Sequence, residues 1–175
     1  MARLLGEEKQ VTLEVWRERL AGLPIAPEFP LEKRLQMRAD GLIELNLNDT
    51  AVADLSPLEG MPLAVLYLGR CREVSDVRPL RGLPLKRLSL RDTGVGDLAP
   101  LGAILTLERL TLPGRTRDLT ALRGLRLHFL TGLRQISCEY TPGADLRLIE
   151  STAQFWAKRA RAEALRDPAR GRASV

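Results

Sequence analysis

Residues 41–62 read GLIELNLNDTAVADLSPLEGMP, residues 63–84 read LAVLYLGRCREVSDVRPLRGLP and residues 85–106 read LKRLSLRDTGVGDLAPLGAILT. A shorter fourth unit, LERLTLPGRTRDLTALRGLR, follows, and a fifth begins as LHFLTG before the pattern is lost. The first leucine of each Leu-x-Leu pair recurs at steps of 21, 22 and 22 residues, at Leu45, Leu66, Leu88 and Leu110. A second landmark recurs at steps of 22, 21 and 21 residues, at Asp54, Asp76, Asp97 and Asp118. Two landmarks with one period predict a tandem repeat.

Each repeat begins with a short strand. Side chains alternate across a strand, so the two leucines of a Leu-x-Leu pair point to the same face. Stacked repeats would join these leucines into an aliphatic core that no single repeat can bury. This suits a chain with 45% hydrophobic but only 4% aromatic residues. Just after the strand come Thr50, Cys71 and Thr93, small polar residues that we expect to bind backbone groups as the chain turns.

The second half of each repeat predicts a turn into a short helix. Asp54, Asp76 and Asp97 are expected to cap it by accepting hydrogen bonds from free backbone N–H groups. A proline follows in three of the units, where a first-turn residue needs no donor. We expect a leucine of each unit to point inward from this side, and these are Leu58, Leu80, Leu101 and Leu122. Gly60 and Gly82 are expected to end the helix.

These units resemble bacterial leucine-rich repeats of the internalin-like type. The GMPL and GLPL joints at residues 60–63 and 82–85 are especially similar to repeats of planctomycete proteins. In that group such arrays often stand alone or follow a Ser/Thr protein kinase domain, and the resemblance implies protein binding. The stretch ISCEYTPGADLRLIESTAQFWAKR also resembles the closing segment of that group, although residues 125–150 look shortened.

We therefore predict an α/β leucine-rich-repeat solenoid with short parallel strands on a concave face and short helical or irregular convex segments. Residues 1–40 form a predicted N-terminal helical cap, residues 41–138 the solenoid, and residues 139–175 a C-terminal helical cap with a basic tail. Leu13, Trp16 and Leu20 share one face of the first cap helix. In the second cap, Phe155 and Trp156 are expected to cover the last coil. The fifth strand falls at Phe129 to Thr131, at Gln135 to Cys138, or at both.

Searches for catalytic and metal-binding motifs return nothing. The sequence has no phosphate-binding loop, nucleophile elbow, zinc-protease motif or kinase signature. Its cysteines, Cys71 and Cys138, lack a C-x-x-C spacing and a neighbouring histidine, so neither a metal site nor a cofactor is expected. With no signal peptide or membrane span, we expect a monomeric cytoplasmic protein. The chain is therefore interpreted as a non-catalytic scaffold.

The candidate binding surface is the exposed side of the strands. Alternation predicts that three rows of residues face outward. The first row is Glu44, Val65, Arg87, Arg109 and Phe129, the second is Asn46, Tyr67, Ser89, Thr111 and Thr131, and the third is Asn48, Gly69, Arg91 and Pro113. Tyrosine and arginine are enriched at interface hot spots. The predicted contact residues are Tyr67, Arg87, Ser89, Arg91, Arg109, Thr111 and Phe129.

Two other functions remain open at this point. The net charge of +5 and the arginines of the predicted face also fit a nucleic-acid binder, although the chain lacks the aromatic platform of RNA-binding modules. The resemblance allows a regulatory repeat segment of a larger Ser/Thr kinase. We favour a protein partner with an acidic or polar surface.

Overall fold

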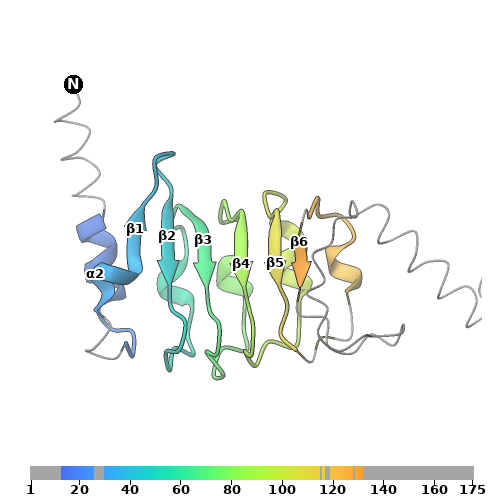
Figure 1. Ribbon diagram of the computed structural model, residues 1–175, viewed down its shortest axis with the longest axis horizontal. Coiled ribbons are helices and arrows are strands. Elements are labelled where there is room, and N and C mark those ends of the chain that lie inside the picture. Colours follow the sequence, from blue (N-terminus) through green and yellow to red (C-terminus); the bar gives the residue numbers. More distant parts are fainter. Residues whose placement is uncertain (1–12, 26–29, 115, 117–118, 128, 132–175) are drawn as a thin grey trace, which may run out of the picture.

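The computed structural model describes residues 13–25, 30–114, 116, 119–127 and 129–131. Within this part, six strands form one sheet in which each strand neighbours the next in chain order (Figure 1). The strands are β1 (Leu35–Met37), β2 (Ile43–Asn46), β3 (Leu63–Tyr67), β4 (Arg87–Ser89), β5 (Arg109–Thr111) and β6 (Phe129–Thr131).

The strands from β2 to β6 are parallel, and their register follows the repeat. The repeat leucines pair directly across neighbouring strands, in the row Leu45, Leu66, Leu88, Leu110 and Leu130. Each of them is at most 3% exposed, as the alternation predicts. A sheet of parallel strands built one per repeat is consistent with a leucine-rich-repeat fold.

Short helical turns alternate with the strands along the chain. They are η1 (Ser56–Leu58), η2 (Arg78–Leu80), η3 (Ala99–Ala103) and η4 (Thr120–Leu122), all of them 3-10 helices. The leucine predicted to point inward from each turn is fully buried, which holds for Leu58, Leu80, Leu101 and Leu122. These leucines belong to the same core cluster as the strand leucines.

Three aspartates cap these turns as predicted. One carboxylate oxygen of each accepts the backbone N–H two residues ahead at 2.8 Å, and the donors are Ser56, Arg78 and Ala99. Each aspartate stands one residue before the N-cap position, so the contact is an Asx turn. The predicted glycine stops are also observed, because Gly60 and Gly82 adopt φ of +73° and +80°.

The small polar residues after the strands bind the backbone as expected. The hydroxyl of Thr50 donates to the Leu47 carbonyl at 2.7 Å, and the Cys71 thiol of the next repeat donates to the same carbonyl at 2.9 Å. The Thr93 hydroxyl makes the matching bond to Leu90 at 2.8 Å. Cys71 is fully buried, which agrees with its interpretation as a turn residue.

The N-terminal region, predicted as a helical cap over residues 1–40, contains a strand as well as helices. Residues 13–20 are helical, and a second helix, α2, covers Leu31–Arg34. The chain then forms β1, which pairs antiparallel with β2, so the sheet begins before residue 41. The connecting turn is stabilised by Asp40, which accepts the Leu42 N–H, and by Gly41 at φ +79°. The strand is three residues long and lies outside the repeat, so no recurring pattern reveals it.

The two predicted caps would cover the two ends of the sheet. At the N-terminal end Leu20 is fully buried, and Leu13 and Trp16 pack against the core, as their shared helix face predicts. At the other end the fifth repeat forms β6 at the first of the two predicted positions. The alternative strand at 135–138, Cys138, Phe155, Trp156 and the predicted cap at 139–175 lie outside the described residues.

A left-handed residue follows the strand in each of the first three repeats, at Asp49 (φ 59°), Arg70 (φ 65°) and Asp92 (φ 54°). Aspartate tolerates this conformation, whereas arginine is strained in it by about 1 kcal/mol. Arg70 also forms an exposed ion pair with Asp49 at 3.0 Å.

Replacement of Arg70 by asparagine should therefore stabilise the protein. The variant Arg70→Asn relieves the strain and loses only a surface ion pair, so we expect a melting temperature about 2 °C higher than that of the wild type. The control variant Arg70→Ala loses the same ion pair and keeps the strain, so it should melt at or below the wild-type temperature. Thermal unfolding followed by circular dichroism measures both, and equal melting temperatures for the two variants would contradict the strain.

The capping carboxylates should also make stability depend on pH. Two hydrogen bonds, from the Ser56 hydroxyl and from the Ser56 N–H, lower the pKa of Asp54 below its ordinary value of 3.8. The side chain and N–H of Arg78 lower the pKa of Asp76 in the same way. Groups with a lowered folded pKa stabilise the fold above the ordinary pKa and lose this effect as the pH falls through the folded value.

The double variant Asp54→Asn/Asp76→Asn keeps acceptors for the two N–H groups and removes the charges. We expect it to melt below the wild type at pH 6, with the difference shrinking as the pH falls below about 3.8. Melting curves at half-unit pH steps test this. A difference that stays constant from pH 6 to pH 2 would show that the charges contribute nothing.

Candidate functional site

The sheet has an outer face, the side opposite the leucine core, which we call the outer strand face. Its side chains stand in two rows because the strands are in register. The first row contains Glu44, Val65, Arg87 and Arg109, and the backbone of Phe129 takes the matching position in β6. The second row contains Asn46, Tyr67, Ser89 and Thr111, and the backbone of Thr131 takes the matching position in β6. Both rows are those that alternation predicts.

The predicted contact residues differ in exposure. Arg91 and Arg109 are exposed. Partly exposed are Tyr67, Arg87, Ser89 and Thr111. The backbone of Phe129 lies in β6, but its side chain is outside the described part. The structure thus places the described contact residues on adjacent strands or just beyond them, within β3 to β5.

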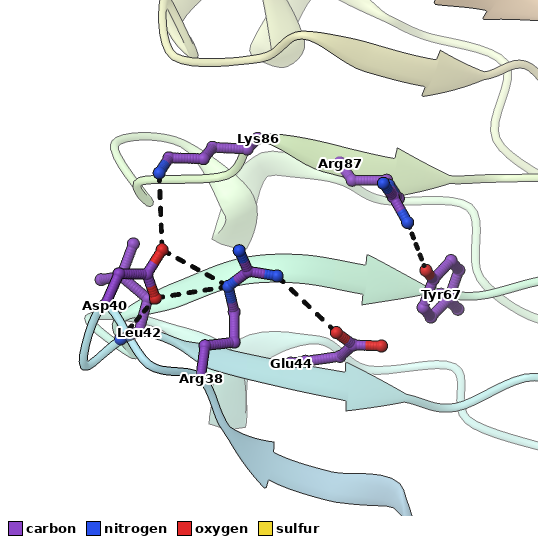
Figure 2. A network of polar contacts seen from close by, with 7 residues as sticks. All are labelled: Arg38, Asp40, Leu42, Glu44, Tyr67, Lys86 and Arg87. Atoms are coloured by element: carbon purple, nitrogen blue, oxygen red, sulfur yellow. Dashed lines mark hydrogen bonds and ion pairs between the residues drawn. The ribbon is translucent and has the colours of Figure 1, made fainter.

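Tyr67 and Arg87 form the centre of this group. The Arg87 guanidinium donates a hydrogen bond from Nη1 to the Tyr67 hydroxyl at 3.1 Å. Figure 2 shows the Arg87 side chain leaving β4 toward β3, where Tyr67 stands. The phenol is a neutral partner, so this bond orients Arg87 without neutralising its charge.

Three outward positions are buried, contrary to the prediction. Val65 is only 3% exposed although it stands in the first row, between Glu44 and Arg87. Gly69 and Pro113, assigned to the third row, are buried as well. The Gly69 N–H donates to the Asn48 side chain at 2.6 Å, and a Cβ at Gly69 would lie 2.8 Å from that oxygen. At Gly69 and Pro113, the third row is therefore covered by other parts of the protein.

A four-residue ion network lies on the outer strand face beside β3, the strand that carries Val65. Arg38, at the end of β1, lies 3.3 Å from Asp40 and 3.9 Å from Glu44 on β2. Asp40 also lies 3.5 Å from Lys86, the residue before β4. As Figure 2 shows, the network crosses from β2 to β4, and it passes β3 on the outer strand face. We attribute the burial of Val65 to the Arg38 side chain within this bridge.

Hydrogen bonds and ion pairs of this network fix the charge of Asp40. Partial desolvation would raise the pKa of Asp40, but the Leu42 N–H, the Arg38 hydrogen bond and the charges of Arg38 and Lys86 lower it below 3.8. Arg38 and Lys86 carry two positive charges, and Asp40 and Glu44 carry two negative ones, so the network is formally neutral.

The sequence pattern did not reveal this ion network, because Asp40 and Lys86 are 46 residues apart. The Asp40-Gly41 pair, a common hairpin turn, was the available signal.

A second contact ties the N-terminal region to the first repeat. Arg34 of α2 donates from Nη1 to the carbonyls of Asn46 and Asn48, both at 3.0 Å. Asn46 in turn accepts the N–H of Asn48 at 3.0 Å. These bonds lie at the carboxyl end of β2, so the polar groups there already make hydrogen bonds within the protein.

Among the described residues, no three His, Cys, Asp or Glu side chains group closely enough to hold a metal ion. In the same part of the chain, no helix has the length and apolar composition to cross a membrane.

Comparison with known proteins identifies a structural relative of this chain. No family model matches the chain, and no curated protein matches it. Among solved structures, it is similar to internalin C2 from Listeria monocytogenes, with 32% sequence identity and a TM-score of 0.44. The match covers 50% of this chain and 41% of the internalin chain, so it spans less than half the length of that relative.

The assignment of Arg38 as the cover of Val65 predicts different results for two substitutions. Arg38→Met retains most of the aliphatic stem and loses only ion pairs of partly exposed groups, so its melting temperature should stay within about 1 °C of wild type. Arg38→Ala removes the stem and exposes Val65, so we expect a decrease of about 3 °C. An equal decrease in both variants, measured by thermal unfolding, would assign the stability to the ion pairs instead.

Proposed function

We propose that this chain is a non-catalytic protein-interaction module that binds its partner through the outer strand face, as the concave face of a repeat solenoid. The observation that supports this most directly is the register of β3, β4 and β5. It sets Val65, Arg87 and Arg109 in one row and Tyr67, Ser89 and Thr111 in the next. A continuous surface made from several repeats suits a macromolecule better than a small molecule.

The composition of this surface supports a protein partner with an acidic surface. Tyrosine and arginine combine a large contact area with hydrogen-bonding groups, and both are common among residues that dominate binding energy. The Tyr67–Arg87 bond holds the arginine in place before a partner arrives, which reduces the entropy lost on binding.

Affinity capture from cell lysate, with and without nuclease, tests this function. We expect the folded wild-type chain to retain specific proteins after nuclease treatment. The variant Tyr67→Ala/Arg87→Glu/Arg109→Glu should lose them, because it removes the aromatic contact and reverses the charge of the row. Circular dichroism establishes that each variant is folded.

A matched control separates the site from bulk charge. The variant Arg81→Glu/Arg123→Glu changes the net charge by the same amount, since both variants replace two arginines with glutamate. Arg81 and Arg123 follow η2 and η4, away from the strands. We expect this control to retain the captured proteins. Capture unaffected by the first variant would refute the outer strand face as the site, and capture abolished by nuclease would make nucleic acid the partner.

A further inference from the structure

The hydrogen bond between Arg87 and Tyr67 leaves both side chains with unused donors. The Arg87 guanidinium donates from Nη1 to the Tyr67 hydroxyl oxygen at 3.1 Å, and its other N–H groups remain. The phenol accepts this bond, so its own O–H proton points elsewhere. Within the described part of the chain, neither side chain has a further polar partner. Two neighbouring donors therefore face no acceptor among the described residues.

This pair of donors is accessible on the outer strand face. Tyr67 ends β3 and Arg87 begins β4, and both side chains are partly exposed. Figure 2 shows the guanidinium extending from β4 toward the phenol on β3. A ligand that approaches the sheet from solvent can therefore contact both side chains together.

Two donors with one positive charge suit a carboxylate. An ionised carboxylate has two oxygens, and both only accept hydrogen bonds. One oxygen can accept from the guanidinium and the other from the phenol, because the two donor atoms are 3.1 Å apart. Hydrogen bonds between arginine and a carboxylate are charge-assisted and roughly twice as strong as neutral ones.

The neighbouring cations of this face favour a carboxylate over a chain of phosphates. Nucleic acid gains its affinity for a protein from several phosphate contacts at once. On this face Lys86 lies 3.5 Å from Asp40, and Arg91 lies 3.4 Å from Asp92. A phosphate chain across Arg87 would have to compete with these carboxylates of the protein at both positions.

We propose that Tyr67 and Arg87 together bind one carboxylate of the protein partner, on an aspartate or glutamate side chain. Arg87 supplies the charge, and Tyr67 both orients the guanidinium and donates its own O–H to the ligand. This inference rests on the proposed function and names the group that the site recognises. It makes the Tyr67 hydroxyl, in addition to the aromatic ring, a determinant of specificity.

Two capped tripeptides test the ligand by NMR titration of the full chain. The peptides acetyl-Ser-Glu-Ser-amide and acetyl-Ser-Gln-Ser-amide have nearly the same shape and differ in the carboxylate. The reporter is the Nε–H resonance of Arg87, assigned through its absence in Arg87→Lys. At constant ionic strength we expect the glutamate peptide to shift this resonance and to bind about threefold more tightly than the glutamine peptide. Equal binding of the two peptides would overturn the inference.

The variant Tyr67→Phe tests the hydroxyl, because it keeps the ring and loses the O–H. We expect it to weaken binding of the glutamate peptide about threefold and to leave binding of the glutamine peptide unchanged. A merely structural role of Tyr67 would not distinguish the two peptides. Wild-type affinity of Tyr67→Phe for the glutamate peptide would overturn the part assigned to the hydroxyl. Circular dichroism establishes that the variant is folded.

A matched pair of variants tests the charge. Arg87→Gln should weaken binding of the glutamate peptide by at least about threefold. Lys86→Gln removes one positive charge from the preceding residue, whose ammonium faces Asp40, and it should leave the affinity unchanged. Equal weakening by both variants would indicate diffuse attraction and overturn the inference.

Failure here can be told apart from failure of the proposed function. If the two peptides bind alike while the outer-face triple variant still loses its captured proteins, the interaction module stands and the carboxylate site falls. If the triple variant captures the same proteins as wild type, the module itself falls. Dimethyl phosphate carries a single phosphodiester with one negative charge. Tighter binding of dimethyl phosphate than of the glutamate peptide would replace the carboxylate with a nucleic-acid phosphate.

Discussion

The parallel stacking of one short strand per repeat is the constraint on which the rest of this structure depends. Each strand contributes few hydrogen bonds and a single leucine to the buried row, and neither is sufficient for a stable unit alone. When the strands align, Leu45, Leu66, Leu88, Leu110 and Leu130 form a continuous buried row. The same alignment sets the outward side chains in rows. The alignment of the strands therefore produces both the buried core and the rows of the candidate site.

The turns between strands and helical segments must fit this fixed spacing. Asp54, Asp76 and Asp97 satisfy the first N–H of the 3-10 turns η1, η2 and η3, while Thr50 and Cys71 bind the Leu47 carbonyl at the opposite turn. A left-handed residue reverses the chain after the strand, and at Arg70 the repeat uses a residue poorly suited to that conformation. The geometry of the stack thus outweighs local preference.

Charge pairing divides the outer strand face into two parts with different roles. Around Arg38, Asp40 and Lys86, opposite charges bind each other and connect the N-terminal strand to the third repeat. At Arg87 the partner is a neutral hydroxyl, so the arginine is held in position and its charge is retained. The first arrangement links the end of β1 to the start of β4, and the second orients Arg87 within the surface that we propose as the binding site.

The amino-acid sequence alone determined the repeat period, the leucine rows, the capping aspartates and the outward rows that contain Tyr67, Arg87 and Arg109. These features depend on strand alternation and on hydrogen bonds between residues close in sequence, and a recurring pattern reveals both. Only the tertiary structure decided the pairing of β1 with β2, the burial of Val65 and the charge balance around Arg38. Those features depend on contacts such as Asp40 with Lys86, which are distant in sequence and occur once. A period cannot reveal an interaction that does not repeat.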